Sequence, residues 1–409
     1  MTRSSLLLLL SVAFAASPST TPGSLDPAFE KIPFDRWLSE RDPGLFHWSA
    51  QLSRPELSFH QRLVSQVQIK LDGRDLETRR GDGRLVFLVQ LTGADGIRYQ
   101  NHGSIELAKL DQNIKAANLE YSQRAFVLPG DYRLAVAILD TATGEHSTKQ
   151  ANFRVPPPPH DPLPGSWRGL PPVEFVGELE TPDAWYLPEV HGRLNWSTSP
   201  QINIILNVDS KRTQGSELAA LLPTLKAIAP LSEHIELLDL ARRRAIFQQN
   251  GVHDLDWPAL KASLGDASTA SIDVHSLAER HHDAQFFVSE TRRLLRASPE
   301  PCILVVLTSP VAFESGEDLA PISQEALPSC HVVYIRYHPP VQSVHPLGRQ
   351  MGGRGRGSRF GGPMTGDRLR PILPDQLEAT LKPLNPKVFD VDTPEQMSKA
   401  IAEIEKASR

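Results

Sequence analysis

The chain lacks an excess of charge of either sign. Its 409 residues contain 43 Lys and Arg against 48 Asp and Glu, which gives a formal net charge of −5 at pH 7. A charge this close to balance provides no general attraction to nucleic acid or to an anionic membrane. We therefore expect no nucleic-acid partner, and any anionic partner would have to be recognised by a local patch.

The chain also lacks the short motifs of common hydrolases and nucleotide-binding enzymes. It contains no Gly-x-Ser-x-Gly, no Gly-x-x-x-x-Gly-Lys and no His-Glu-x-x-His. These absences leave no positive argument for catalysis. We expect a non-enzymatic protein.

Long apolar runs are confined to the beginning of the chain. Arg3 precedes the apolar residues 6–14, and small residues stand at Ala13 and Ala15. This layout is typical of a secretory signal peptide, so we expect cleavage after Ala15 or Ala16 and an exported protein, periplasmic or secreted. The run is much shorter than the ~20 residues that a spanning helix needs, so we expect no membrane span. Residues 1–16 are then the signal peptide and residues 17–43 an N-terminal extension.

Cysteine is nearly absent, with two residues in the chain, Cys302 and Cys330. Each immediately precedes an apolar run, at residues 303–307 and 331–337. If these runs are neighbouring parallel strands, the two cysteines lie level and can form a disulfide, as suits an exported protein. Two separate buried thiols are the alternative.

Turn-forming residues are abundant, and they divide residues 44–155 into short strands. Val67, Ile69 and Leu71 alternate with polar residues, which is the two-residue period of a half-buried strand. Several such strands without helical patterns between them predict an all-β sandwich. The stretch 128–134, followed by a strand that ends near Val155, resembles the last hairpin of immunoglobulin-like or fibronectin type III-like modules.

The following segment, residues 156–199, is a proline-rich linker. Its prolines, from Pro156 to Pro172, lack the backbone donor of a strand, so we expect this spacer to join neither flanking sheet. From residue 200 onward, apolar strands alternate with helical patterns, and the last helix begins at Thr393 and Pro394. This order predicts a doubly wound α/β domain over residues 200–409, with a Gly/Arg-rich loop at 340–370.

Two strand ends carry a family resemblance. Residues 204–213 and 305–310 resemble the ends of the first and fourth strands of von Willebrand factor A domains. In that family the first strand ends in Asp-x-Ser-x-Ser, which with a threonine and an aspartate from other loops holds Mg²⁺ for an acidic side chain of a partner protein. The whole chain resembles the exported bacterial proteins called von Willebrand factor A-related.

The resemblance implies a binding crevice made of Asp209, Ser210, Lys211, Thr213 and Ser309. Asp209 matches the first metal ligand and Thr213 could replace the second serine, but Lys211 stands where a serine hydroxyl belongs and Ser309 where the aspartate belongs. An ammonium group in place of a ligand opposes Mg²⁺. We therefore expect a degenerate site that holds no Mg²⁺ or other cofactor, in a protein that binds another protein or a cell-envelope component.

Two alternatives to this function stay open. One is a working metal-dependent adhesion module. The other is a cell-envelope hydrolase that uses Asp209 with the nearby His275, His281 and His282. Adjacent histidines on a helix point about 100° apart and make a poor chelate, so we favour solvated polar residues for this group.

A tract at residues 348–362 is rich in glycine and arginine and contains no acidic residue. Arg349, Arg354, Arg356 and Arg359 resemble an arginine–glycine tract that binds anions such as nucleic acid or acidic polysaccharide. Four charges give only weak binding at physiological salt. We favour a solvated insertion and keep anion binding as the alternative.

Overall fold

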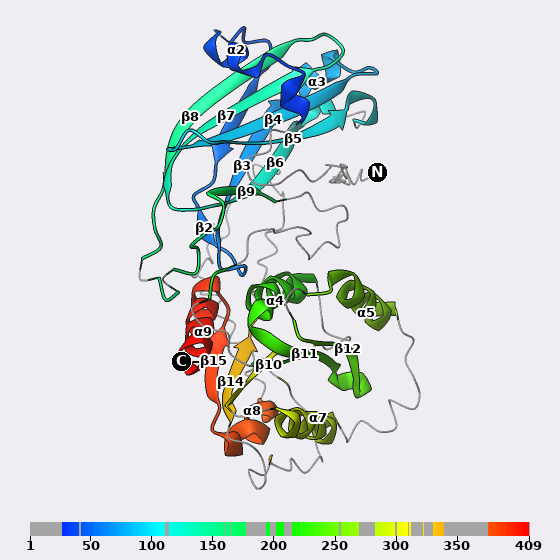
Figure 1. The fold of residues 1–409 in the computed structure, drawn as a ribbon. Helices are drawn as coiled ribbons and strands as arrows, with labels where there is room; N and C mark the ends of the chain where they lie inside the picture. The colour runs from blue at the N-terminus through cyan, green and yellow to red at the C-terminus, as the bar shows by residue number, and fades with distance from the viewer. Residues whose placement is uncertain are drawn as a thin grey trace, which may run out of the picture.

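The computed structural model describes residues 27–40, 42–110, 114–159, 161–163, 165–176, 194–196, 202–207, 215–252, 255–269, 283–298, 301–309, 311, 322, 330–338 and 375–408. These residues form two regions, one made of two antiparallel sheets and one made of a mostly parallel sheet with helices (Figure 1). The expectation of a multidomain protein rich in β-sheet is thereby confirmed. Within the described residues, no helix is long and apolar enough to cross a membrane.

The first region is a pair of antiparallel sheets packed around one core. One sheet consists of β1 (Trp48–Leu52), β3 (Leu63–Asp72), β6 (Asn118–Val127) and β9 (Val173–Phe175) in that order, with β2 (Glu56–Leu57) paired to β3. The other has the order β5 (Arg98–Glu106), β4 (Arg84–Gly93), β7 (Gly130–Asp140) and β8 (His146–Val155). Val67, Ile69 and Leu71 point into the core, as their alternation predicted.

The start of β7 is fastened to the chain on both sides of it. The hydroxyl of Tyr132 donates to the carbonyl oxygen of Leu128 at 2.8 Å and lies 3.1 Å from that of Pro172. The backbone N–H of Leu128 donates to the same Pro172 oxygen at 2.9 Å. This corner holds the connection between β6 and β7 against the end of the proline-rich segment.

Short helices cover the sandwich at its outer face and at one end. α1 (Pro27–Glu30) and α2 (Phe34–Ser39) bury Phe29, Phe34 and Trp37 against Leu88 and other residues of the second sheet. α3 (Gly73–Thr78) follows β3 directly, with Asp72 as its N-cap. Part of the predicted N-terminal extension therefore packs on the sandwich.

The proline-rich segment differs from its prediction in one respect. Val173–Phe175 form β9 and pair antiparallel with Ala125–Val127 of β6, so this segment does join a flanking sheet. The prolines themselves donate to no ladder, but the residues directly after Pro172 are free to pair, and the edge of β6 was open to them.

The second region is a six-stranded sheet in which only one edge strand is antiparallel to its neighbour. β10 and β13 are buried along their whole length, as expected for strands covered on both faces. The strand order is β12 (Arg244–Asn250), β11 (Ser232–Asp239), β10 (Ile202–Asn207), β13 (Cys302–Thr308), β14 (Cys330–Tyr337) and β15 (Lys387–Val391).

Helices cover both faces of this sheet. α4 (Gly215–Ile228), α5 (Trp257–Thr269) and α9 (Pro394–Ala407) pack on the face toward the sandwich, and α7 (Asp283–Ala297) and α8 (Gln376–Leu381) pack on the other (Figure 1). α9 begins as predicted, because Thr393 and Gln396 form a reciprocal capping box and Pro394 occupies the first turn. Short 3₁₀ helices occupy Leu107–Lys109, Ile114–Ala116, Ala229–Leu231, Leu240–Arg242 and Lys382–Leu384.

A disulfide joins Cys302 and Cys330, as predicted. The two residues are register partners at the starts of the parallel strands β13 and β14, and their Cα atoms lie 4.7 Å apart. The bridge therefore clamps two central strands at their amino ends.

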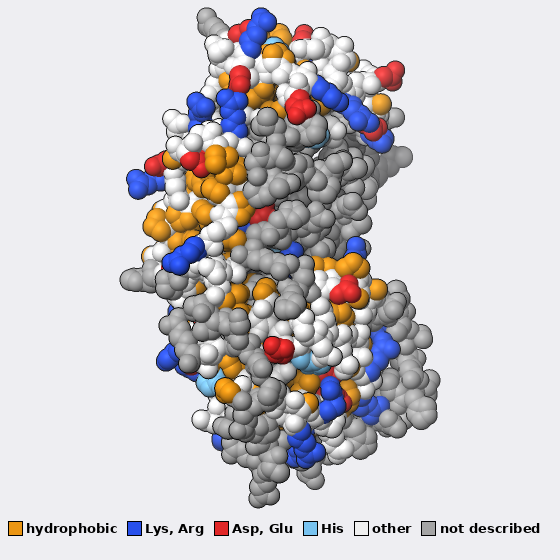
Figure 2. Space-filling model, in the orientation of Figure 1, with side chains coloured by type: hydrophobic (Ala, Val, Ile, Leu, Met, Phe, Trp, Pro, Cys, Tyr) orange, Lys and Arg blue, Asp and Glu red, His pale blue; other side chains and the backbone are white. Residues whose placement is uncertain are grey.

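The charges on the surface are mixed. On the face shown in Figure 2, side chains of Lys and Arg are scattered among those of Asp and Glu over both regions. This distribution agrees with the balanced composition, and the described residues on this face form no broad anionic or cationic surface.

Candidate functional site

The carboxyl ends of the parallel strands lie at one edge of the α/β sheet, which we call the carboxyl edge. Its strands end at Asn207, Asp239, Thr308, Tyr337 and Val391. β10, β11, β13, β14 and β15 are parallel to one another, so these residues share one side of the sheet.

The connections that leave this edge diverge between β10 and β13. The chain that leaves β10 continues into α4, on the face toward the sandwich. The chain that leaves β13 passes through Val311 and Ile322, which pack with α7 and α8 on the opposite face. In open α/β sheets, ligands bind in the crevice at such a switch point. The geometry thus places the candidate site between the ends of β10 and β13.

A buried amide joins the strand ends at this switch point. The Nδ2 of Asn207 donates to the Oγ1 of Thr308 at 3.0 Å, and the Oδ1 of Asn207 accepts from the backbone N–H of Leu240 at 3.4 Å. The Thr308 hydroxyl donates in turn to the carbonyl oxygen of Ser309 at 2.9 Å. The Asn207 side chain therefore ties the ends of β10, β11 and β13 together, which makes these strand ends rigid rather than reactive.

The turn between β11 and β12 brings three consecutive arginines to the carboxyl edge. Asp239, fully buried at the end of β11, pairs with Arg242 at 3.4 Å. Arg243 adopts a left-handed backbone conformation with φ of 49°, and Arg244 begins β12 opposite Asp239. Three guanidinium groups against one carboxylate favour an anionic group over a divalent cation in this place.

The sequence analysis predicted a site at the ends of the first and fourth strands but did not single out these residues. Asn207 lies within the predicted strand end at residues 204–213, and Asp239 and the arginines at 242–244 were not considered. The available signal was the run of three arginines between two strand patterns, because a turn that follows a parallel strand must lie at the carboxyl edge.

The predicted site residues are only partly within the described residues. Ser309 is described: it directly follows β13, is half-buried, and accepts the Thr308 hydrogen bond through its carbonyl oxygen. The others lie outside the described residues: Asp209, Ser210, Lys211, Thr213, His275, His281, His282, Arg349, Arg354, Arg356 and Arg359. Among the residues that are described, no three His, Cys, Asp or Glu side chains are grouped so as to hold a metal ion. The expectation of no Mg²⁺ at Asp209 therefore stays a prediction.

An ion-pair cluster joins the two ends of the segment that contains the Gly/Arg-rich tract. Arg336 of β14 lies 2.6 Å from Glu378, 2.7 Å from Asp390 and 3.5 Å from Asp375. His338, just beyond β14, lies 3.0 Å from Asp390. Burial alone would raise the pKa of Asp390, but hydrogen bonds from His338 and Arg336 outweigh it and lower this pKa. The cluster holds the last residues before position 339 against the first residue after position 374.

A second cluster fastens α7 to the edge of the sheet. The carboxylate of Glu236 is fully buried; it pairs with Arg293 at 2.6 Å, accepts from Gln248 at 2.6 Å and lies 3.6 Å from His234. Burial would raise the pKa of Glu236, but hydrogen bonds from His234 and Gln248 lower it. The hydrogen bond with Glu236 raises the pKa of His234. Because these partners occupy the carboxylate, the cluster serves packing and leaves Glu236 unsuited to act as a base.

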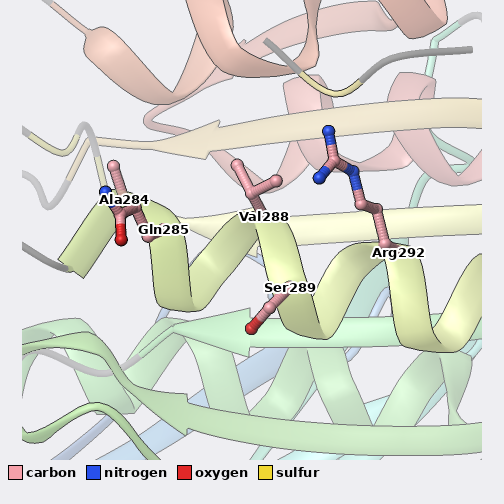
Figure 3. A pocket seen from close by; sticks show the side chains of 5 residues that line it. All are labelled: Ala284, Gln285, Val288, Ser289 and Arg292. Atoms are coloured by element: carbon pink, nitrogen blue, oxygen red, sulfur yellow. The ribbon is translucent and has the colours of Figure 1, made fainter. Parts of the chain in front are cut away.

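The described part of α7 also lines a small hollow of about 180 Å³. Figure 3 shows Val288 and Arg292 on one side of the helix and Ser289 on the other. Its described lining, completed by Ala284 and Gln285, comes from this one helix. The hollow is a weaker candidate than the carboxyl edge, where several elements converge.

Comparisons with known proteins add little. No family model matches the chain, and no curated protein matches it. The chain is similar to the X-ray structure of Northeast Structural Genomics Consortium target SoR45, with 14% identity over 29% of this chain and 91% of that chain and a TM-score of 0.19. It is also similar to Northeast Structural Genomics target BeR40 from Bordetella pertussis, with 12% identity over 28% of this chain and 97% of that chain and a TM-score of 0.18. Likenesses at this level carry no argument about fold or function.

Proposed function

We propose that the chain is an exported, non-enzymatic protein-binding or scaffold protein. In this proposal an immunoglobulin-like sandwich is joined to a von Willebrand factor A-like domain, which binds a partner protein or cell-envelope component at the carboxyl edge without Mg²⁺. The observation that carries the proposal is the switch point between β10 and β13, where Asn207 is hydrogen-bonded to Thr308 and arginines 242–244 follow the neighbouring strand β11.

The strand order supports the assignment of the second region. Numbered from β10 in chain order, the sheet has the order 3-2-1-4-5-6, which is a common order of doubly wound sheets. The segments with the von Willebrand factor A resemblance, around residues 204–213 and 305–310, include the ends of β10 and β13. Both halves of the resemblance thus belong to the switch point.

The sandwich has two features of immunoglobulin-like modules. Two antiparallel sheets enclose one core, and Tyr132 at the start of β7 bonds back to Leu128, in the manner of the tyrosine corner of those modules. Such sandwiches occur widely in proteins that bind other proteins, but the fold itself does not determine the function.

Charge supports binding without a metal. At the end of β11, arginines 242–244 outnumber the carboxylate of Asp239, which is paired with Arg242. The carboxylates of Asp375, Glu378 and Asp390 lie at the other end of the edge, where they surround Arg336. The sequence adds Lys211 and Arg212 to the connection that leaves β10. A site with this balance attracts an acidic group of a partner and repels Mg²⁺.

Site-specific photo-cross-linking tests this proposal. A photoreactive residue at Ser309 should capture a partner from cell-envelope extract, whereas the same residue at Ser289, exposed on α7, should not. Adding Arg244→Glu to the Ser309 probe should reduce the capture. Equal capture from both positions, or none from Ser309, would contradict a binding site at the carboxyl edge.

A further inference from the structure

One hairpin of the sandwich contacts the α/β region at the carboxyl edge, beside a separate apolar contact in which Leu128 and Leu170 pack with Ala227 of α4. Residues 58–62 connect β2 to β3, and the ring of Phe59 packs edge-on against Tyr337, with centroids 5.7 Å apart. The Nε2 of Gln61 donates to the carbonyl oxygen of Pro394 at 3.4 Å. Tyr337 ends β14 and Pro394 begins α9, so the hairpin covers part of the carboxyl edge. Figure 1 shows β2 on the side of the sandwich that faces α9.

The hairpin is held in one conformation. The backbone N–H of Ser58 donates to the carbonyl oxygen of Arg62 at 2.9 Å, and the Ser58 hydroxyl donates to the same oxygen at 2.8 Å. Gln61 has a φ of 58°, in the left-handed region, and its carbonyl oxygen accepts from the indole N–H of Trp167 at 2.7 Å. A backbone conformation of this kind costs free energy, so the surrounding contacts must maintain it.

His60 is buried in the same hairpin, between the contacting residues Phe59 and Gln61. Its side chain is 7% exposed, and its ring meets Phe126 of β6 edge-on at 5.3 Å. Among the described residues, its Nε2 atom has no hydrogen-bond partner. A buried imidazole without an acceptor for its proton is stable only in the neutral form.

The charged groups around His60 are mainly cations. Lys226 acts on it from α4 and Arg62 from its own hairpin. Arg62 is 2% exposed, lies over the Phe126 ring at 4.6 Å and pairs with Glu174 of β9, which offsets that carboxylate. The ammonium of Lys226 lies 5.7 Å from the centre of the Trp257 ring. A proton on His60 would therefore meet two positive charges inside the contact.

These surroundings set the protonation of the ring. Burial first, and then the charges of Lys226 and Arg62, lower the pKa of His60 from its ordinary value of 6.5 to about 3. When the hairpin leaves the contact, the ring loses the charge of Lys226 and part of its burial, so its pKa rises toward the ordinary value of 6.5. We call the form in which the two regions are in contact docked and the form in which they are apart separated. His60 is therefore neutral in the docked form at a pH at which it can take up a proton in the separated form.

We propose that the contact between the sandwich and the α/β region opens on acidification, with His60 as the group that takes up the proton. Opening uncovers the ends of β14 and the start of α9, and so widens access to the carboxyl edge. The feature is a conformational switch that is independent of the identity of the partner.

The sign and size of the effect follow from linkage. The docked form binds fewer protons than the separated form, so docking is strongest above pH 6.5 and weakens as the pH falls toward about 3. Below pH 6.5 one proton changes the docking equilibrium by at most about tenfold per pH unit, which gives at most about 30-fold between pH 7.5 and pH 5.

The test uses the full chain with spin labels on exposed residues of each region, Glu120→Cys on β6 and Lys399→Cys on α9. We expect one distance between the labels at pH 7.5 and a second, longer population that grows as the pH falls to 5. Hydrogen exchange in the first turn of α9, corrected for intrinsic rates, should lose protection by up to about 30-fold over the same range.

Two variants separate His60 from other titrating groups. His60→Phe keeps a buried ring but cannot take up a proton, so docking should persist without a response to pH. If this variant docks poorly at pH 7.5, His60→Gln serves the same purpose. His47→Gln removes a histidine that is 81% exposed on the sandwich and should keep the wild-type response. An unchanged wild-type distance distribution and exchange at pH 5, or the same response in His60→Phe, would overturn the proposal.

Discussion

The two regions of the chain differ in how far their strand contacts reach along the sequence. In the second sheet of the sandwich, β4 pairs with β5 and β7 pairs with β8 through short turns. In the α/β region, Ile202 of β10 lies beside Ile303 of β13, with two strands and several helices between them in the chain. Local turn signals therefore suffice to predict much of the sandwich, whereas the α/β sheet is assembled by contacts that no local pattern encodes.

The two regions also differ in whether local patterns identify core residues or candidate site residues. The sandwich residues that the pattern identifies are core residues, such as Val67 and Ile69. The residues that define the candidate site are polar, stand at strand ends, and acquire meaning only when distant strands lie side by side. The predictions below test whether the two regions are as independent as this contrast implies.

The largest effect is expected from the sandwich core. Phe87 is fully buried and its ring stacks on Tyr121 at 4.3 Å. Phe87→Ala should destabilise the sandwich by about 3–5 kcal/mol, because it removes a large buried ring and leaves a cavity. Calorimetry should show this loss in one unfolding transition and leave the transition of the α/β region in place. A single unfolding transition that shifts as a whole would show that the sandwich and the α/β region unfold together and are not independent.

The disulfide is the matching test in the other region. Cys302 and Cys330 are 28 residues apart in sequence, and closing such a loop contributes about 3 kcal/mol in the chain-entropy model. Cys330→Ser should lower the stability of the α/β transition by about this amount, as measured by urea unfolding without reductant. Adding reductant should affect the wild type but not the variant. Unchanged stability in the variant would show that the bridge constrains the unfolded chain less than the model assumes.

Two asparagines on β10 allow an effect on partner binding to be separated from an effect on stability. Asn207→Ala breaks the hydrogen bonds to Thr308 and Leu240 and should cost about 1–3 kcal/mol. Asn203→Ala, on the same strand as Asn207, is the control. It breaks a hydrogen bond to Ser298 and should lower the free energy of unfolding by a similar amount. In cross-linking from Ser309, only Asn207→Ala should reduce partner capture. Equal reduction by both variants would assign the effect to stability alone.

Removal of the Gly/Arg-rich tract should have a small effect on stability. The cluster around Arg336 holds both ends of the surrounding segment, so deleting residues 348–362 should change the melting temperature by no more than about two degrees. If the tract binds anions, the deletion should abolish a salt-dependent affinity for heparin, with a slope set by at most four charges. Retained heparin binding would transfer this role to other arginines, with those at 242–244 as the first to test.

The smallest effect is expected from divalent cations. If the protein bound a divalent cation, a free cation concentration of 100 times the dissociation constant would add about 2.7 kcal/mol to the free energy of unfolding. We expect neither Mg²⁺ nor Mn²⁺ to raise the melting temperature of the α/β transition, because Lys211 and Ser309 replace two groups that the metal needs. A clear rise that disappears in Asp209→Ala would instead establish the metal-dependent adhesion module.

The sequence allowed much of this fold to be predicted, for physical reasons that vary with the element. Alternation along β3 reflects one buried face, and the capping box at Thr393 satisfies backbone donors locally, so both were readable. The disulfide was predictable because each cysteine immediately precedes an apolar run. β9 was missed because three residues after Pro172 carry no pattern of their own and form a strand only where β6 offers an open edge. His60 was missed for a similar reason, since its burial depends on two regions meeting.

The ring of ion pairs around Arg336 has a consequence for engineering. Arg336 and His338, at the end of β14, are tied by ion pairs to Asp390 of β15 and to Asp375, the N-cap of α8. We therefore expect the sheet to tolerate changes in the length of the chain between residues 338 and 375, so that this segment can accept an insertion. A peptide tag or a small reporter domain exchanged for residues 348–362 should be displayed beside the carboxyl edge while the sheet beneath it keeps its register.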